Sequence, residues 1–224
     1  MYGLDFSILS ENYKTIFAGI SMTVLVSSIA SVIAFVLGTF FVYFRISPNE
    51  SVQKIMDFLV SCIRNMPLLI LIYLFYKGLP SIGIVFSAFV CGVLALGIYT
   101  AAYISDALLS GIYAVPKEHF QASKALGLTR IQSFLYIIYP QALRHCVFIL
   151  GSQFMNLIKN SSLVSFIAVA DTFYVVYKGM ADSYRIYEYF ILAVVVYGSL
   201  TLFVLLVTNI LQKNYKLPAA EVRV

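Results

Sequence analysis

The strongest constraint on this chain is a stretch of 29 residues, Ile16–Phe44, that contains no charged side chain. As an α-helix it would extend about 43 Å, which is more than the roughly 30 Å hydrocarbon core of a bilayer. Only 11% of the 224 residues are charged and 61% are hydrophobic, far from the balance of a soluble domain. The sequence therefore predicts an integral membrane protein and excludes a disordered chain, a collagen-like repeat and a disulfide scaffold.

Further apolar stretches bring the predicted number of membrane spans to five. They cover residues 16–44, 55–76, 82–104, 146–168 and 187–211 of a single all-α domain that comprises residues 1–224. Arg64 and Pro67 interrupt the second stretch, and a polar run at Lys159–Ser162 interrupts the fourth. Neither half of the fourth stretch can cross a bilayer alone, so we count it as one span. Met1–Tyr13 lacks the basic start of a signal peptide, and we expect the first span to be retained.

The distribution of Lys and Arg predicts the orientation of these spans. With the N-terminus outside, the inner segments carry nine basic residues and the outer segments carry four. Because basic residues are enriched on the cytoplasmic side, the C-terminus and the long polar segment 105–145 are predicted to be cytoplasmic. The net charge of +5 contains no run of five like charges. These basic residues therefore indicate topology and contact with membrane lipid rather than nucleic acid binding.

The segment 105–145 has the local signals of two short helices. Pro116 suits the start of a helix, and Gly127 suits its end in the left-handed conformation. Thr129 and Gln132 have the spacing of a capping box for a second short helix, which ends before Pro140. A helix-turn-helix between two spans is either a docking element for a cytoplasmic partner or an amphipathic hairpin on the lipid headgroups.

Part of this segment resembles the EAA motif of the permease subunits of ABC importers: EAA, three residues, Gly, nine residues, Ile, one residue, Leu-Pro. The spacing matches throughout, and the resemblance assigns coupling to an ATPase to six positions: Gln121, Ala122, Ser123, Gly127, Ile137 and Pro140. Gln121 stands where the motif has Glu, Ser123 where it has the second Ala, and Tyr139 where it has Leu. An ionic contact between the motif Glu and the ATPase is therefore not carried over to this chain.

Three further stretches resemble the polar amino acid uptake subfamily of these permeases. Arg64–Leu69 is similar to its R-G-T-P-L-L pattern, with Asn and Met in the middle. Ala101–Lys117 is similar to the run that leads into its EAA loop, with Asp106 where Glu is common. Gln153–Leu163 is similar to its N-Q-F-I-x-L-I-K-D-T-S-L stretch. Together with the EAA motif, the resemblance covers about Gly19–Leu211, almost the whole chain.

This resemblance implies an all-α integral membrane fold like that of ABC type I importers, with five transmembrane helices and a cytoplasmic helix-turn-helix coupling loop. It implies a multi-pass protein of the bacterial inner membrane that forms the translocation path for a polar amino acid. The implied partners are two ATPase subunits, a second permease subunit that is identical or related, and an extracytoplasmic substrate-binding protein. No nucleic acid partner is implied.

The chain contains no phosphate-binding motif of the form G-x-x-x-x-G-K-[ST]. We therefore expect a transport subunit that is not an enzyme and holds no cofactor of its own, while ATP and Mg²⁺ bind to the partner ATPase. The three cysteines form no CxxC pair, and His119 and His145 are 26 positions apart, so no metal site is expected. Ser51–Lys54 matches the nucleophile pattern S-x-x-K without its companion motifs, which indicates a chance match.

Two charged residues in the predicted spans, Arg64 and Lys159, require partners because an isolated charge in hydrocarbon is costly. Asp106 and Asp171 are the nearest candidates by topology. The two cations either hold helices together or line a wet path, where the breaks in the second and fourth spans open helix backbone toward a midplane cavity. The residues that we expect to line the path are Leu68, Asn160 and Ser161.

Two features bear on what is carried and what docks outside. In relatives that move cationic amino acids, an acidic residue at position 160 could pair with the substrate, so an uncharged Asn160 disfavours lysine or arginine. The segment Asp171–Glu188 mixes charged residues with four tyrosines. It is either a gate and contact surface for the binding protein or a tyrosine belt at the headgroups.

The main alternative function is a stand-alone secondary carrier or channel for small polar solutes. That class predicts a selectivity filter, paired intramembrane carboxylates or two internal repeats, and none is recognisable in these five stretches. A membrane-embedded enzyme is a third class, and the sequence lacks a convincing nucleophile with its base. Uptake that depends on ATP rather than on an ion gradient would distinguish the importer from the carrier.

Overall fold

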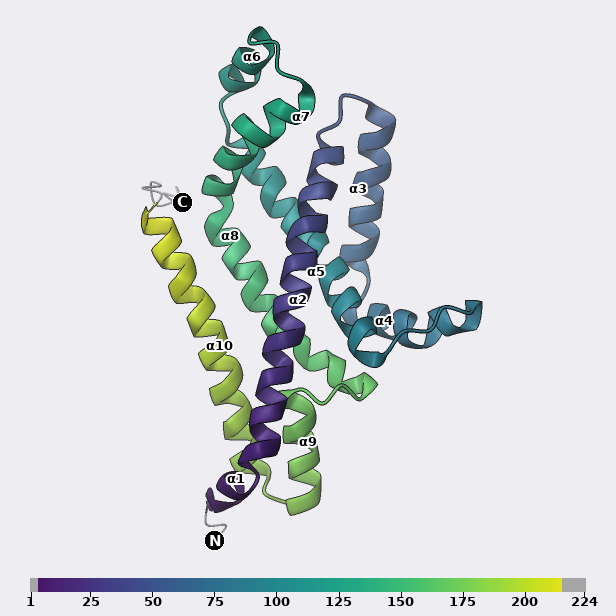
Figure 1. The fold of residues 1–224 in the computed structure, drawn as a ribbon, viewed down its shortest axis with the longest axis vertical. Coiled ribbons are helices and arrows are strands. Elements are labelled where there is room, and N and C mark those ends of the chain that lie inside the picture. Colours follow the sequence, from purple (N-terminus) through teal and green to yellow (C-terminus); the bar gives the residue numbers. More distant parts are fainter. Residues whose placement is uncertain (1–3, 215–224) are drawn as a thin grey trace.

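The computed structural model describes residues 4–214, and all regular structure in this range is helical (Figure 1). Short 3₁₀- and π-helical pieces, labelled η, separate several of the α-helices. The elements in chain order are α1 (Ser7–Glu11), α2 (Tyr13–Arg45), α3 (Glu50–Asn65), α4 (Leu68–Tyr73), η1 (Leu74–Gly78), η2 (Leu79–Ile82), α5 (Ala88–Tyr113), α6 (Lys117–Ala125), α7 (Arg130–Gln132), η3 (Ser133–Ile138), α8 (Tyr139–Asn160), η4 (Ser161–Ile167), α9 (Thr172–Ser183) and α10 (Ile186–Asn214).

Four helical runs in the described range are long and apolar enough to cross a membrane. They cover residues 13–45, 88–113, 130–167 and 186–213. A fifth candidate is α3 together with the run Leu68–Ile82, a pair that is bent by 100°. The all-α membrane fold with up to five spans is therefore confirmed.

The chain turns sharply at Pro67, which interrupts the predicted second span, residues 55–76, and the helices on the two sides of the break lie at 100° to each other. Met66 has an extended backbone, with φ −87° and ψ 132°. A proline lacks the N–H that would continue the helix, and its ring disfavours helical backbone in the preceding residue. The segment after the bend runs across the bundle instead of along it (Figure 1).

The third span also differs from its predicted bounds of 82–104. Gly83 is left-handed with φ 86°, and the Ser87 hydroxyl caps α5 by accepting a hydrogen bond from the Val90 N–H at 3.3 Å. The helix therefore begins at Ala88, and it continues to Tyr113 because its later turns are buried against neighbouring helices. The predicted loop 105–145 consequently loses its first part to α5 and its last part to α8.

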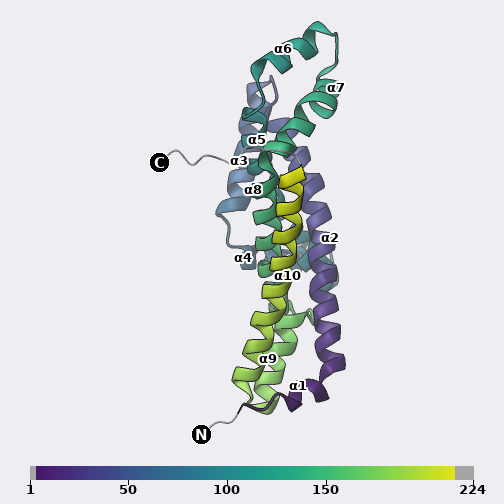
Figure 2. The same ribbon diagram turned by 90° about the vertical axis from the view of Figure 1, so that its left-hand side faces the viewer.

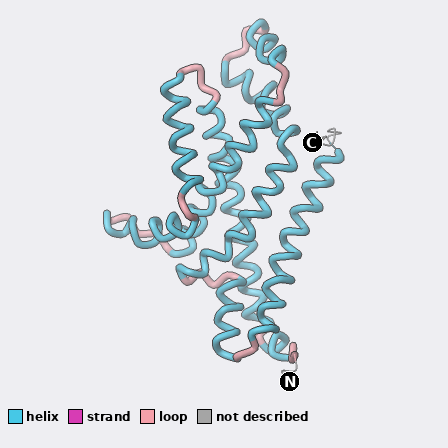
Figure 3. The backbone as a smooth tube through the Cα atoms, turned by 180° about the vertical axis from the view of Figure 1, so that it is seen from behind, coloured by secondary structure: helices cyan, strands magenta, loops and turns pink. Residues whose placement is uncertain are grey.

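The long helices run side by side, and the connecting segments gather at two ends (Figures 1 and 2). α6, α7 and the end of α10 lie at one end, whereas α1 and α9 lie at the other. The view from behind shows the remaining loops around the sideways projection that follows α3 (Figure 3). Two of the nine basic residues predicted on the inner side, Lys216 and Arg223, lie outside the described residues.

The core of the bundle is the contact between α2 and α5, which small residues bring close together. A Cβ added to Gly38 of α2 would meet the Ile104 side chain, and one added to Gly97 of α5 would meet Ile33. Several alanines of the two helices are fully buried: Ala30, Ala34, Ala95, Ala101 and Ala102. In a membrane such close packing stabilises a helix pair, because lipid supplies no hydrophobic driving force between helices.

The helix α10 has the opposite character and exposes large apolar side chains along its length. The exposed residues include Val194, Val195, Leu202, Phe203, Leu206 and Ile210. Such a surface suits hydrocarbon or another membrane subunit and would be unfavourable in water. This exposure agrees with a membrane-spanning role for the chain.

Replacement of Gly111 by alanine should lower the melting temperature of the purified protein in detergent. The added Cβ would lie 2.5 Å from the carbonyl oxygen of Ala142, which belongs to the backbone of α8 and cannot rotate away. Overpacking of this kind costs about 1–3 kcal/mol. Gly198→Ala is the matched control, because no atom of a neighbouring element lies within 4 Å of its added methyl group. Equal melting temperatures for the two variants would contradict this packing.

Candidate functional site

A helical hairpin, residues Lys117–Ile138, projects at the end of the bundle where α10 also ends (Figure 1). Pro116 precedes α6, and Gly127 follows it in the left-handed conformation with φ 71°. Thr129 and Gln132 form both hydrogen bonds of a capping box at the start of α7. Each of these local features matches the expectation from its sequence signal.

The second arm of the hairpin is not a separate short helix that ends before Pro140, as the sequence predicted. It passes through the π-helical turn Ser133–Ile138 directly into α8, so that one helical run extends to Ile167. Proline is tolerated in the first turn of a helix, where its missing N–H is not needed. The wider π-helical turn before it also relieves the i→i−4 hydrogen-bond pattern that the ring would disturb.

The hairpin exposes apolar side chains although it projects beyond the packed core of the bundle. Leu126 is 73% exposed and Tyr136 is 74% exposed, and Ile131 and Leu135 are exposed as well. Among the six residues assigned to coupling, Gln121, Ala122, Gly127 and Pro140 are also exposed, Ile137 is half-buried and Ser123 is buried. The Ser123 hydroxyl donates a hydrogen bond to the Phe120 carbonyl oxygen at 2.9 Å. An exposed apolar face of this kind suits contact with a partner protein or with the membrane surface.

The hairpin is attached to the last turn of α2. Arg130 Nη2 donates a hydrogen bond to the Tyr43 carbonyl oxygen at 2.7 Å, and its guanidinium lies 4.4 Å from the centre of the Tyr43 ring. The Tyr43 ring packs edge-on against Phe134 with 5.1 Å between centroids. About one helix turn earlier, Thr39 and Tyr139 share a hydrogen bond of 2.8 Å between their hydroxyls.

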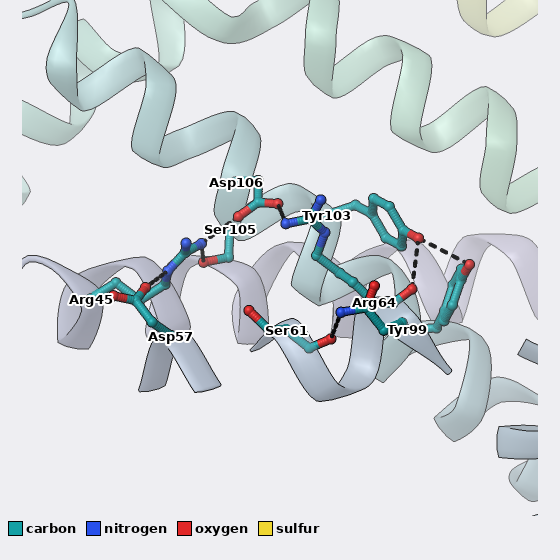
Figure 4. Close-up of polar contacts among 9 residues, drawn as sticks. Arg45, Asp57, Ser61, Arg64, Tyr99, Tyr103, Ser105 and Asp106 are labelled. Atoms are coloured by element: carbon teal, nitrogen blue, oxygen red, sulfur yellow. Dashed lines mark hydrogen bonds and ion pairs between the residues drawn. The ribbon is translucent and has the colours of Figure 1, made fainter. Parts of the chain in front are cut away.

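An ionic cluster joins α2, α3 and α5 (Figure 4). It consists of Arg45, Asp57, Arg64 and Asp106. Arg45 Nε contacts Asp57 Oδ1 at 2.6 Å, and Arg45 Nη1 contacts Asp106 Oδ1 at 2.6 Å. The second oxygen of Asp106 pairs with Arg64. Of the two candidate partners, Asp106 is the one that pairs with Arg64, and the cluster of two cations and two anions is neutral.

Sequence reasoning did not identify Arg45 and Asp57 as members of this cluster. Both lie near span ends, where charges are ordinary, and nothing in the sequence shows which helix faces meet. The Arg45 side chain is only 10% exposed, which requires that its charge be compensated. Two carboxylates and the Ser105 hydroxyl, 3.1 Å from Arg45 Nη1, supply that compensation.

A polar pocket of about 330 Å³ lies between α5 and α8. Its lining consists of Leu157 and of residues with hydroxyl, amide or ammonium groups: Tyr99, Thr100, Tyr103, Gln153, Asn156, Lys159 and Asn160. Gln153, Asn156 and Asn160 have the i, i+3, i+7 spacing of one helix face, a signal that could have identified the α8 side of the pocket. The tyrosines of α5 could not be assigned in this way because aromatic residues occur all along the chain.

The expected path residues have different positions in the structure. Asn160 lines the pocket, whereas Leu68 belongs to the packed core and is 6% exposed. Ser161 is completely buried, and its hydroxyl donates a hydrogen bond to the Ile158 carbonyl oxygen at 2.8 Å. Within the chain as described, the side chains of Leu68 and Ser161 therefore do not line this pocket.

Lys159 lines the pocket, and neither of the two candidate partners, Asp106 and Asp171, forms an ion pair with it. Among residues 4–214, no carboxylate forms an ion pair with Lys159. Asp171 instead caps α9 by accepting a hydrogen bond from the Tyr174 N–H at 2.9 Å, and it accepts another from the Tyr197 hydroxyl at 3.0 Å. The pocket is thus a cationic and hydrogen-bonding site.

Two tyrosines connect the pocket to the ionic cluster. The Tyr99 and Tyr103 hydroxyls are 3.1 Å apart, and the Tyr103 hydroxyl donates a hydrogen bond to the Arg64 carbonyl oxygen at 3.3 Å. The Arg64 guanidinium also lies 5.4 Å from the centre of the Tyr103 ring. Figure 4 shows this continuous set of contacts from Tyr99 to Arg45.

The opposite end of the molecule has its own polar contacts. Arg185 lies 3.4 Å from Glu188 Oε1 and 3.8 Å from Asp5 Oδ2. Hydrogen bonds from the side chain and backbone N–H of Ser7 lower the pKa of Asp5 below its usual range, which keeps the carboxylate ionised for this pairing. Exposed tyrosines surround the segment, including Tyr177, Tyr184 and Tyr187.

Comparison with known proteins gives one consistent result. A family described as "Binding-protein-dependent transport system inner membrane component" matches residues 30–216. The chain is 35% identical over 211 residues to the probable glutamine ABC transporter permease protein GlnM of Bacillus subtilis (strain 168), covering 94% of this chain and 98% of that protein. It is 30% identical over 216 residues to the glutamate/aspartate import permease protein GltJ of Escherichia coli (strain K12), covering 91% and 88%.

A solved structure has the same fold. It is described as the crystal structure of an amino acid ABC transporter with histidines, and it matches with a TM-score of 0.84 and 28% sequence identity. The match covers 95% of this chain and 100% of the solved chain. The similarity in fold therefore extends over almost the whole chain.

The polar pocket can be tested by reaction of single cysteines with a hydrophilic thiol reagent. A cysteine introduced by Asn160→Cys should react because Asn160 lines the pocket, whereas one introduced by Ser161→Cys should not because Ser161 is completely buried. The parent chain carries Cys62→Ser, since Cys62 is exposed while Cys91 and Cys146 are buried. Mass spectrometry measures the modified fraction, and equal modification at both positions would contradict the pocket geometry.

Proposed function

The chain belongs to the family of binding-protein-dependent transport system inner membrane components, and we propose that it is the permease subunit of an ATP-driven ABC importer for polar amino acids. The observation that carries this proposal is a polar pocket between membrane helices in the same chain as a hairpin with an exposed apolar face. The first can receive a polar solute, and the second can receive a soluble subunit that supplies energy.

The proposed division of labour follows from what the sequence lacks. Because the sequence contains no phosphate-binding loop, we assign ATP and Mg²⁺ to separate ATPase subunits, one docked on the hairpin of each permease subunit. A second permease subunit, identical or related, would complete the path, and an extracytoplasmic binding protein would deliver the substrate. The relatives that carry the words "ABC transporter permease" support this assembly.

The proposed orientation places the hairpin and the end of α10 in the cytoplasm and the α1–α9 end outside. The basic residues support it, since the side of the hairpin carries most of them. The structure brings the hairpin and the end of α10 to one end of the molecule, as this orientation requires. Docking of the binding protein on the outer end would involve the tyrosine-rich segment 171–188.

The chemistry of the pocket favours a neutral or acidic amino acid as substrate. The Lys159 ammonium can attract a carboxylate, and the amides and hydroxyls around it can bind either end of a zwitterion. No acidic side chain belongs to the described lining, so a cationic side chain would have no counter-charge there. The names of the relatives GlnM and GltJ, a glutamine and a glutamate/aspartate transporter, agree with this class.

The proposed mechanism is alternating access. ATP binding closes the two ATPase subunits, and their movement is passed through the hairpin to α8, since η3 and α8 are one continuous helical run. The helices then open the pocket to the outside to receive the substrate from the binding protein. A secondary carrier, the alternative function, would need no hairpin with an exposed apolar face, and it would follow an ion gradient instead of ATP.

The docking assignment can be tested by purification of the tagged chain from its native membrane in mild detergent. An ATPase should co-purify with the parent chain, and Gly127→Val should reduce its recovery, because a β-branched residue is strained at φ 71°. Gly127→Asn is the matched control, since Asn tolerates the left-handed conformation and no atom obstructs either side chain. A parent chain that brings no ATPase and moves solute down a gradient when reconstituted alone would favour the carrier.

The substrate assignment can be tested by Asn160→Asp. An acidic residue in the pocket would supply the counter-charge that a cationic side chain needs, so uptake in proteoliposomes should shift from glutamine toward arginine. Competition of unlabelled arginine against labelled glutamine measures this preference. A variant that transports normally with unchanged preference would contradict the placement of Asn160 in the substrate path.

A further inference from the structure

We propose that the last turn of α2, residues Tyr43–Arg45, is a joint that couples the position of the hairpin to the state of the polar pocket. The inference rests on the proposed function, because it names residues that would transmit movement between the ATPase and the substrate site. It assigns positioning roles to Tyr43, Arg45 and Asp106, none of which touches the pocket or belongs to the EAA motif.

The coupling route has three parts, and the first connects the pocket to the end of α3. The last carbonyl groups of a helix have no partner within the helix. At the end of α3 the Arg64 carbonyl receives its hydrogen bond from Tyr103, a residue of the pocket lining. A solute that displaces the Tyr103 hydroxyl would therefore release this end of α3, which directly precedes the bend at Pro67.

The second step runs through the ionic cluster. Asp106 bridges two arginines, with one carboxylate oxygen on Arg64 and the other on Arg45. Arg45 is nearly buried, so it cannot exchange these partners for water without cost. A shift of Arg64 thus changes the electrostatic field at Arg45, and a shift of α2 changes the charge available to Arg64.

The third part of the coupling route connects α2 to the hairpin. It again involves a carbonyl group at a helix end that has no partner within its own helix. The Tyr43 carbonyl, in the last turn of α2, accepts the hydrogen bond from Arg130 at 2.7 Å. The same guanidinium lies over the Tyr43 ring, a planar contact that lysine would not reproduce. Arg45 and Tyr43 share one helical turn, so the ionic cluster and the hairpin are held by the same piece of backbone.

These contacts form one route with Tyr103 at one end and Arg130 at the other. The alternative is that each contact only stabilises the fold. The two explanations differ in what they predict for ATP, because static contacts would not make the pocket respond to the hairpin, whereas the joint requires it.

The experiment measures how ATP changes the thiol reactivity of the Asn160→Cys chain in its purified complex with the ATPase. Trapping of the ATPase with Mg-ATP and vanadate should change the rate of modification in the parent complex. Asp106→Asn, which leaves one positive charge of the cluster uncompensated, should reduce that change about 2- to 30-fold while ATP hydrolysis continues. Asp106→Glu, which restores the charge, should recover most of the response.

Glu50→Gln is the matched control. Glu50 forms an exposed ion pair with Lys54 on α3, the helix that also carries two members of the cluster, but this pair does not contact the cluster. Arg130→Lys is a second test variant for the case that Asp106→Asn does not fold. Position 130 is exposed, and the substitution retains the positive charge. Arg130→Lys should weaken the ATP response as well. The double variant, Asp106→Asn with Arg130→Lys, should lose no more of the response than the single variant that loses more, as expected for one shared route.

A variant complex that hydrolyses ATP and retains the full ATP-dependent change in modification would overturn the joint while leaving the proposed importer intact. So would additive losses in the double variant, which indicate independent structural effects. A parent chain that recovers no ATPase at all would overturn the proposed function, and the joint with it.

Discussion

Small residues allow the backbones of α2 and α5 to approach closely, and this contact determines where the charged groups of both helices lie. Gly38 and Gly97 provide the space in which Ile104 and Ile33 pack. The contact continues toward the hairpin and brings Arg45, at the end of α2, beside Asp106 on α5. A wider separation of these two helices would break this ion pair and leave Arg45 with Asp57 alone and Asp106 with Arg64 alone.

The buried charges and helix ends of the bundle follow one physical rule, which is that an unsatisfied polar group is costly in hydrocarbon. The ionic cluster is neutral, and helix ends inside the protein receive donors from other helices, as at Arg64 and Tyr43. Lys159 is different, because it faces a polar pocket and forms no ion pair within the described chain. This contrast separates the charges that join helices from a charge that a polar solute in the pocket could reach.

Much of the local structure could be predicted from the sequence. The left-handed Gly127 and the capping box of Thr129 depend on neighbouring residues only, and the structure contains both. The lining of the polar pocket was harder to predict, because Leu68 and Ser161 were chosen as path residues only for their proximity to breaks in the spans. The structure buries both and assembles the pocket from Asn160 together with tyrosines of α5, which are about 60 residues away along the chain.

The sequence by itself determined the membrane environment, the all-α class, the family and the hairpin signals, since these depend on composition, on spacing along the chain and on local backbone preferences. Only the tertiary structure decided how far the second span is bent at Pro67, that Asp106 serves two arginines, and that Lys159 lines the pocket without an ion pair among the described residues. The physical reason is that hydropathy reports how deeply a helix is buried in the membrane, whereas ion pairs and pockets depend on which faces of different helices meet. Those faces are set by packing between residues far apart in the chain.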